Sequence, residues 1–316
     1  MEISVTMPVY NVEPYLEQAI ESALAEPETA EIIVVDDGSE DSSLTICRRF
    51  AERDPRIRIL RHPNGENRGL AASRNLAISE SRCEYVAFLD SDDYYLLNRF
   101  SHAAGIFAAD PKVDGVFEAV GLLFEDEQTR RRFNDPDRSM HTIVNGFEPE
   151  GLLRDLIDNK GWFHFDGIVV KRSLMDRTGL FEEHAKTGTV LGMEFKMAAA
   201  GRIMPGILDK PVAMRRMYGE SITARMRRIA DLQDNKRVFR EVWDWAKDKD
   251  LRPADKSLIF LAACWGDALP YTDLPRPIPQ LAKAASLGMN MIRSPRMLAS
   301  SSLWRLLAQR GAGKLG

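Results

Sequence analysis

Two short apolar runs in the first hundred residues each end on a group of aspartates. The first run is Ile32 to Val35 and is followed by Asp36 and Asp37. The second is Tyr85 to Leu89 and is followed by D-S-D-D at residues 90–93. Short apolar runs with β-branched and aromatic members are typical of buried strands. Because ligands of open α/β sheets bind beyond the carboxyl ends of the strands, we expect both acidic groups to lie in a ligand site.

The acidic groups have two interpretations. Asp is a favoured first residue of a helix, so Asp93 can simply begin one, and Asp36 can order a turn. Alternatively, carboxylates this close together repel one another unless a cation lies among them, and Mg²⁺ or Mn²⁺ prefers oxygen ligands. Two strand ends with paired acids are hard to explain as unrelated caps, which favours the metal.

The composition is that of a soluble globular protein. The 316 residues are 44% hydrophobic and 28% charged, enough for one large domain or one domain with an appendage. Cys47, Cys83 and Cys264 are scattered, which indicates a reducing compartment rather than a disulfide framework. A strand pattern directly after Met1 predicts no signal peptide, and no apolar run approaches the ~18 residues of a membrane span. We therefore expect a cytoplasmic protein.

The spacing of apolar residues predicts alternating strands and helices. Strands are expected at Ile3 to Met7, Ile32 to Val35, Ile57 to Leu60 and Tyr85 to Leu89, and helices at Glu13 to Leu24, Asp41 to Arg53 and Leu70 to Ser79. This order predicts a parallel α/β sheet with right-handed crossovers. The phosphate loops GxGxxG and GxxxxGK[ST] are missing, so bound phosphates must be neutralised by a metal or by basic side chains.

Four ordered motifs resemble a known family. V-T-M-P-V-Y-N, I-V-V-D-D-G-S, N-R-G-L-A-A-S-R-N and F-L-D-S-D-D closely resemble the family 2 glycosyltransferases, densely over the first hundred residues and more thinly to about residue 225. The resemblance implies the GT-A fold, a Rossmann-like, mainly parallel sheet flanked by helices. It also implies a nucleotide-sugar donor, a divalent metal and inversion at the anomeric carbon. We expect a catalytic domain over residues 1–225 and a helical region over 226–316.

The resemblance implies roles for residues around the nucleotide. Pro8, Val9 and Tyr10 would border the nucleobase, and Asp37 would hydrogen-bond it, most often as uracil. Arg74 and Asn75 would lie near the donor pocket, although Arg74 can also be read as a solvated helix residue, and Tyr10 as a sheet-edge aromatic.

The resemblance implies a second group around the diphosphate. Asp90 would contact the ribose or sugar with Ser91 beside it, and Asp92 would bind the metal that bridges the diphosphate. In M-R-R-M-Y-G-E-S-I-T, Arg216 and Ser221 would close over the diphosphate; the alternative for this segment is a loop salt bridge.

One departure from the family pattern concerns the catalytic base. The Glu-Asp pair whose Asp is the base falls on Leu191 and Gly192. The nearest acid is Glu194, which we take as the candidate base, with Glu182 and Glu183 as alternatives, because an inverting transfer needs a carboxylate near the acceptor hydroxyl. A chain that has lost the base and only binds the nucleotide sugar remains open.

The C-terminal third has a different character. Leu269 to Pro279 is predicted to be a linker. The formal net charge of the whole chain is −4, yet seven basic residues and no acid follow Asp273. A basic amphipathic helix with Trp304 and several leucines can lie on an anionic membrane surface, and the alternative is that its apolar face packs on the protein's own core.

The leading hypothesis is a metal-dependent inverting glycosyltransferase that builds a surface polysaccharide. Its partners would be a UDP-sugar and a glycan or lipid-linked glycan acceptor, with no nucleic acid and with peripheral contact to the inner face of the membrane. A nucleotidyltransferase is the rival enzyme class, but it normally carries a glycine-rich basic loop near the N-terminus, where this chain has P-V-Y-N.

Overall fold

The computed structural model describes most of the chain and divides it into two compact units. The described residues are 1–132, 139–141, 149–184, 188–218, 228–266 and 278–312. The first unit comprises Met1–Val190 and Gly201–Arg225, and the second comprises Leu191–Ala200 and Met226–Gly316. Each unit is described by itself below.

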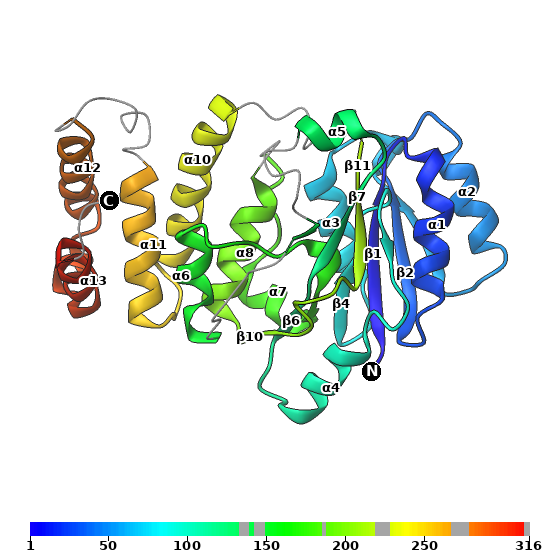
Figure 1. The fold of residues 1–316 in the computed structure, drawn as a ribbon, viewed down its shortest axis with the longest axis horizontal. Coiled ribbons are helices and arrows are strands. Elements are labelled where there is room, and N and C mark those ends of the chain that lie inside the picture. The colour runs from blue at the N-terminus through cyan, green and yellow to red at the C-terminus, as the bar shows by residue number, and fades with distance from the viewer. Residues whose placement is uncertain (133–138, 142–148, 185–187, 219–227, 267–277, 313–316) are drawn as a thin grey trace. The chain divides into compact units, whose positions relative to one another are not determined.

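The first unit is built on a seven-stranded, mostly parallel sheet (Figure 1), which confirms the predicted fold class. Its strands are β1 Ile3–Val9, β2 Thr29–Asp36, β3 Ile57–Arg61, β4 Tyr85–Phe88, β6 Gly115–Phe117, β9 Ile168–Lys171 and β10 Ile203–Pro205. The order across the sheet is β10-β6-β9-β4-β1-β2-β3. Strand β9 runs antiparallel to both of its neighbours, and the other pairs are parallel. The four strands expected from the sequence are therefore present and adjacent.

Helices cover both faces of the N-terminal strands. They are α1 Glu13–Leu24, α2 Ser43–Ala51 and α3 Leu70–Ser79. Successive side chains of β2 point to opposite faces: Ile32 and Val34 join the core that holds the apolar residues of α1 and α2, whereas Ile33 and Val35 pack with Ala77 of α3. Burial on both faces explains why this strand reads as a continuous apolar run.

A second, four-stranded sheet brings a distant strand beside the acidic loop. Its strands are β5 Tyr94–Tyr95, β7 Val120–Phe124, β8 Met140–His141 and β11 Ala213–Met217, in the order β5-β11-β7-β8. Strand β5 directly follows residues 90–93, and β11 pairs with it through Ala213 and Met214. The backbone N–H of Arg216 then donates a 2.7 Å hydrogen bond to Asp93 Oδ1.

The remaining elements of the first unit are short. They are α4 Ser101–Ala109, α5 Glu127–Arg132, α6 Leu152–Ile157, α7 Arg172–Thr178 and the 3-10 turns η1 Pro63–Gly65, η2 Pro149–Gly151 and η3 Phe165–Gly167. The turn η3 leads directly into β9, so the position of this strand fixes the residues just before it.

The second unit is helical in its described residues, as the sequence predicts. It contains most of α8 Thr189–Ala200, together with α10 Arg228–Ala246, α11 Pro253–Gly266, α12 Ile278–Arg293, η5 Pro295–Ala299 and α13 Ser301–Ala312. Phe195 stacks on Phe239 at 5.5 Å, and Trp243 meets Phe260 edge-on at 5.0 Å. Most of the predicted linker lies outside the described residues, but Pro279 falls in the first turn of α12, where proline is tolerated.

Within the described residues, the helices are too short or too polar for one of them to cross a membrane.

Candidate active site

The two acidic turns lie at one edge of the main sheet. They follow β2 and β4, which both pair in parallel with β1. Tyr10, directly after β1, is at the same edge and is 50% exposed, whereas Pro8 and Val9 are buried within the strand. An exposed aromatic ring at a strand end offers a face on which a planar base can stack.

Asp36 and Asp37 order the chain around the end of β2. Asp37 is buried and accepts hydrogen bonds from the backbone N–H groups of Arg68, at 2.7 Å, and Gly69, at 2.8 Å. Asp36 is fully buried, pairs with Arg61 at 2.9 Å and accepts a bond from the backbone of Ser39. Asp36 therefore orders the turn after β2, and Asp37 holds the residues that lead into α3.

Arg74 is a buried cation that reaches the acidic loop. Its side chain is 2% exposed, and its Nη2 lies 2.5 Å from Asp90 Oδ1. The guanidinium carbon lies 5.2 Å from the ring centre of Phe165 and 5.6 Å from that of Phe181. Contacts of this kind stabilise a buried guanidinium. Arg74 is therefore not a solvated residue of the α3 surface.

Asn75, the next residue of α3, holds a segment more than a hundred positions away. Its side-chain amide donates to Phe181 O and to Glu183 Oε1, both at 2.9 Å, and its Oδ1 accepts from the backbone N–H of Phe181 at 2.8 Å. The side chain thus uses both ends of its amide to fix residues 181–183 against the helix.

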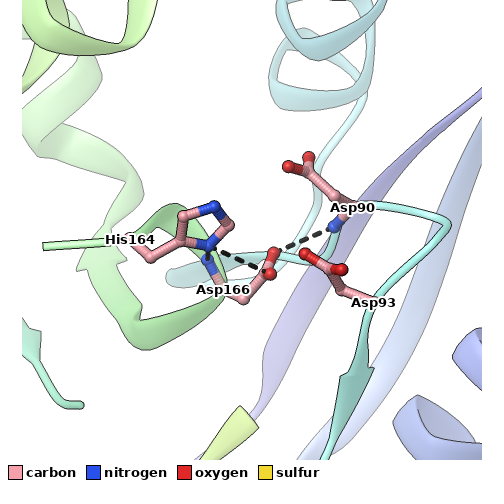
Figure 2. Close-up of side chains that lie close together, drawn as sticks. All are labelled: Asp90, Asp93, His164 and Asp166. Carbon is pink, nitrogen blue, oxygen red and sulfur yellow. Dashed lines mark hydrogen bonds and ion pairs between the residues drawn. The ribbon is translucent and has the colours of Figure 1, made fainter. Parts of the chain in front are cut away.

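Four titratable side chains converge next to the end of β4 (Figure 2). Asp90 and Asp93 come from the loop after that strand, and His164 and Asp166 come from the segment that begins η3. One ligand atom from each lies within 4.8 Å of the others. The carboxylate of Asp166 accepts a bond from the backbone N–H of Asp90 at 2.9 Å. The arrangement ties the acidic loop to the amino end of β9.

Asp93 and Asp166, the two most buried acids of this cluster, have pKa values shifted in opposite directions. Burial raises the pKa of Asp93 well above its usual range, and the charge of Asp166 adds to the effect. Burial also works against ionisation of Asp166, but His164 and a hydrogen bond with Asp93 lower the pKa of Asp166 below its usual range. A protonated Asp93 that donates a hydrogen bond to an ionised Asp166 satisfies both directions, as expected for two carboxyl groups that share a site.

The donor set of this cluster fits a hard divalent cation. Three carboxylates and one imidazole are ligands that Mn²⁺ or Mg²⁺ accepts. Asp166 Oδ2 is buried and lies 3.1 Å from His164 Nδ1. A cation beside this carboxylate would take the place of the proton that Asp93 holds.

Asp92, in the same loop, is bonded to a residue outside this cluster. The hydroxyl of Tyr218, which follows β11, donates a 2.9 Å hydrogen bond to Asp92 Oδ2. Burial raises the pKa of Asp92, the charge of Asp90 raises it further, and the bond from Tyr218 opposes both. Ser91 beside it is buried. The acid that the sequence assigned to the metal therefore has its own partner, just after a strand that is distant in the sequence.

Arg216 contributes both backbone and side chain near the acidic loop. Its guanidinium carbon lies 4.9 Å from the ring centre of Tyr15 and 5.2 Å from that of Tyr94. The side chain also bonds Gln18 and lies 4.0 Å from Glu125. The salt-bridge alternative thus has a basis in the structure, and Ser221, the second residue expected here, lies outside the described residues.

The candidate base is in the second unit. Glu194 lies on α8, is 2% exposed, and burial raises its pKa well above its usual range. Gly192 precedes it by two positions, and a Cβ at Gly192 would meet Val238 at 3.7 Å. Glu182 and Glu183 belong to the first unit, where Glu183 contacts Asn75 and lies 3.7 Å from Arg68.

His164 and Asp166 are not predicted from the sequence as site residues. In a sheet of parallel strands, the residues before a strand lie at the edge of the sheet opposite the acidic turns. Because β9 is antiparallel to β4, the residues before β9 meet the residues after β4. The available signal is an acid and a histidine placed just before the apolar run of β9, in H-F-D-G-I-V-V.

Comparisons with known sequences agree with the motifs. A family model described as Glycosyl transferase family 2 matches residues 4–177. The succinoglycan biosynthesis protein ExoU of Rhizobium meliloti (strain 1021) is 38% identical over 190 residues, which are 57% of this chain and 51% of that protein. The uncharacterized glycosyltransferase EpsJ of Bacillus subtilis (strain 168) is 29% identical over 184 residues, with the same coverages of 57% and 51%. The chain thus spans about half the length of these relatives.

Solved structures share the fold at low sequence identity. TarS residues 1–349 of S. aureus gives a TM-score of 0.64 at 20% identity and covers 92% of this chain and 80% of that one. The mannosyltransferase PcManGT from Pyrobaculum calidifontis, solved with GDP-Man and Mn²⁺, gives a TM-score of 0.55 at 21% identity. The match covers 100% of this chain and 81% of the PcManGT chain. At these identities the likeness establishes the fold alone.

Proposed function

The chain belongs to the family 2 glycosyltransferases, and from this premise we propose that it transfers a sugar from a UDP-sugar to a hydroxyl of a glycan or lipid-linked glycan, with inversion, in surface polysaccharide biosynthesis. The observation that carries the proposal is the acidic loop at the carboxyl edge of the sheet, with the buried Arg74 paired to Asp90. A buried cation at this edge is suited to the neighbourhood of a diphosphate.

Relatives support the class of product. ExoU is named for succinoglycan biosynthesis, and GgaA of Bacillus subtilis (strain 168), 31% identical over 192 residues, is named for minor teichoic acid biosynthesis. These 192 residues are 58% of this chain and 40% of GgaA. Both names concern the biosynthesis of a polymer, which supports a polysaccharide as the class of product.

The donor would bind along the edge formed by β1, β2 and β4. Tyr10 would stack on the nucleobase, with Pro8 and Val9 behind it, and Asp37 would hydrogen-bond the base while it holds the loop at Arg68. TarS has been solved with UDP-GlcNAc and with UDP, and PcManGT with GDP-Man, so uracil and guanine are the bases to compare.

Although the ligand types of the cluster in Figure 2 suit a cation, we assign the metal to Asp92, which is less buried than Asp93 and lies in the same loop. Asp93 and Asp166 are 3% and 0% exposed and each accepts a backbone hydrogen bond, so they would support the loop. Asp92 would then bind Mn²⁺ or Mg²⁺, and Asp90, with 24% of its side chain exposed, would contact the ribose or sugar beside Ser91. When bound, the cation would stabilise the negative charge of the leaving diphosphate.

The remaining residues would act on the phosphates and on the acceptor. Arg216, and Ser221 outside the described residues, would close over the diphosphate. Glu194 would take the proton of the acceptor hydroxyl, because a raised pKa makes a carboxylate a stronger base. If the base is elsewhere, Glu182 and Glu183 are the acids to test first.

One observation favours a second function. Position 192 on α8, where the family pattern has the catalytic Asp, is a glycine that lies beside Val238 of α10. A protein that binds the nucleotide sugar without turnover is therefore the alternative. For either function we propose a cytoplasmic location, because nucleotide sugars are made there and the three cysteines are free.

Calorimetry and a transfer assay test the proposal. UDP-, GDP- and dTDP-sugars are titrated with and without Mn²⁺, and we expect UDP-sugars to bind most tightly and to need the metal. Asp92→Asn should abolish the metal dependence without loss of the folded structure. Tight binding with no transfer to any glycan acceptor would favour the alternative, and unchanged metal-dependent affinity in Asp92→Asn would overturn the metal assignment.

A comparison of the two adjacent acids tests the nucleobase assignment. Asp37→Ala should weaken UDP binding more than Asp36→Ala, because Asp37 is the one placed against the base. The reverse order would shift the assignment by one residue.

A further inference from the structure

Helix α12 has an exposed side that is almost free of polar groups. Its inner side is bonded to the other helices of the second unit: Ser286 donates to Cys264 O at 2.6 Å, and Asn290 accepts from Arg240 at 2.7 Å. The exposed positions between 283 and 293 are Lys283, Ala284, Ala285, Gly288, Met289, Ile292 and Arg293. Charge is thus confined to the two ends of this surface.

The apolar side chains of this surface are large and well exposed. Ile292 is 76% exposed and Met289 is 52% exposed, and they are three positions apart, so they lie on the same side of the helix. A helix that faces water normally carries polar residues on that side, and one that is apolar all round is normally covered. The surface of α12 therefore has the composition of a buried face.

A second exposed apolar pair follows on η5 and α13. Leu298 and Trp304 are each 49% exposed, and the indole N–H of Trp304 donates to Leu298 O at 2.8 Å. That bond satisfies the one polar group of the indole, so the ring can enter an apolar medium without leaving a donor unpaired. On the other side of α13, Leu303 and Leu306 are buried. The segment uses one apolar side for its own core and leaves the other exposed.

The charge of the same segment selects the partner. Every charged residue after Asp273 is basic, and Lys283, Arg293, Arg296 and Arg305 are exposed. This segment combines exposed apolar side chains with arginines and lysines and has no acid. Such a combination suits an anionic lipid bilayer, which has charged headgroups over an apolar interior. Together with a half-exposed tryptophan, this is the composition of an interfacial helix.

We propose that Met289, Ile292, Leu298 and Trp304, with the basic residues around them, form a docking surface for an anionic phospholipid membrane. All of these residues belong to the second unit, whereas the donor residues assigned above belong to the first. The surface therefore does not rest on the proposed function. It would hold the enzyme where lipid-linked acceptors are found.

Vesicle flotation of the full chain tests the surface. The protein should float with vesicles of phosphatidylcholine and phosphatidylglycerol, sink with phosphatidylcholine alone, and be released by high salt. The double variant Ile292→Glu and Trp304→Glu should lower the bound fraction at least tenfold. The matched control is Leu97→Glu in the first unit, where the leucine is 78% exposed, and it should bind as the wild type does.

A second pair of variants separates charge from apolar contact. Arg293→Gln with Arg296→Gln should weaken partitioning by roughly fivefold for each charge removed, whereas Arg53→Gln, at an exposed site of the first unit, should not. Circular dichroism checks that the variants are folded. Equal binding to both kinds of vesicle, or equal flotation of all variants, would overturn the proposal. A wild type that stays unbound, but whose self-association is lost in Ile292→Glu, would overturn it in favour of a second copy of the chain.

Discussion

The guanidinium of Arg74 lies 2.5 Å from the carboxylate of Asp90, sixteen residues further along the chain, and is 2% exposed. The pair joins α3 to the loop after β4. Phe165 and Phe181 lie against the guanidinium, so two segments from the middle of the chain close over a contact between two motifs of its first hundred residues. The pair places one positive charge at the edge of the sheet where the donor is proposed to bind.

Arg74→Lys should destabilise the protein although it keeps the charge. Lysine is a compact ammonium that cannot lie flat against the two rings or present the same planar donors to Asp90. We expect a loss of about 1 to 3 kcal/mol in the free energy of unfolding, measured by urea denaturation. Arg53→Lys, at an exposed position, is the control and should change the value by less than about 0.5 kcal/mol. Equal values for the two variants would contradict the structural role of Arg74.

Asn75→Ala should loosen residues 181–183. The substitution removes three hydrogen bonds and leaves the backbone groups of Phe181 without a partner, which costs about 1 to 3 kcal/mol. Hydrogen exchange should speed up at Phe181 and the residues beside it. Asn75→Asp puts a carboxylate oxygen, which cannot donate, against the acceptors Phe181 O and Glu183 Oε1, so it should lose at least as much as Asn75→Ala. A clearly smaller loss in Asn75→Asp would contradict the donor role of the amide.

Tyr218→Phe should move the pH dependence of metal-dependent UDP binding. Burial already raises the pKa of Asp92, and the Tyr218 hydroxyl opposes this, so removing the hydroxyl raises the pKa further. A cation needs the ionised carboxylate, so binding should fall away at a pH about one unit higher than in the wild type. Calorimetry with UDP and Mn²⁺ across a pH series gives the midpoints. Tyr10→Phe keeps an exposed ring and is the control; a shift of the same size there would remove Asp92 from the explanation.

Glu194→Gln should stabilise the protein above acidic pH. Since burial raises the folded-state pKa of Glu194, its contribution to stability is complete below the unfolded-state pKa and is lost as the pH rises through the folded-state pKa. Glutamine does not ionise, so the gain over the wild type should grow with pH by up to about 1.4 kcal/mol per unit within that window. Urea denaturation at several pH values measures it, and a gain independent of pH would contradict the buried carboxylate.

The same variant tests the catalytic assignment. Loss of a general base lowers the rate by about 10²- to 10⁴-fold, so transfer by Glu194→Gln should fall by that factor while UDP-sugar binding stays near the wild-type value. Glu182→Gln and Glu183→Gln are the controls. Full transfer by Glu194→Gln, with loss in one control, would move the base to the first unit.

Gly192→Ala should stabilise the protein by about 0.5 to 1 kcal/mol, because glycine is a poor residue for a helix interior. The added Cβ would lie 3.7 Å from Val238 and 4.0 Å from Val242, which are ordinary contacts. Gly167→Ala is the contrasting variant: its Cβ would lie 2.4 Å from a backbone oxygen of Glu118, so it should destabilise. Thermal unfolding compares the two, and a loss of stability in Gly192→Ala would contradict the packing around α8.

The sequence alone determined the architecture of the N-terminal region. The predicted strands at Ile32 to Val35 and Ile57 to Leu60 agree with β2 and β3 to within a few residues, and the predicted helix at Leu70 to Ser79 matches α3. These features are local, since they follow from the apolar run or stripe within each element and from the turn residues that bound it. The order of the four motifs by itself also indicates the family.

Only the tertiary structure decided which side chains meet. The sequence of α3 does not show that Arg74 is buried, because the rings that cover it lie some ninety residues or more away. The same is true of Tyr218, which reaches Asp92 across 126 residues. His164 and Asp166 join the acidic loop only because β9 runs antiparallel to β4. Periodicity determines which side of its own element a residue occupies, whereas its partners depend on how distant elements pair, and that is a property of the folded chain.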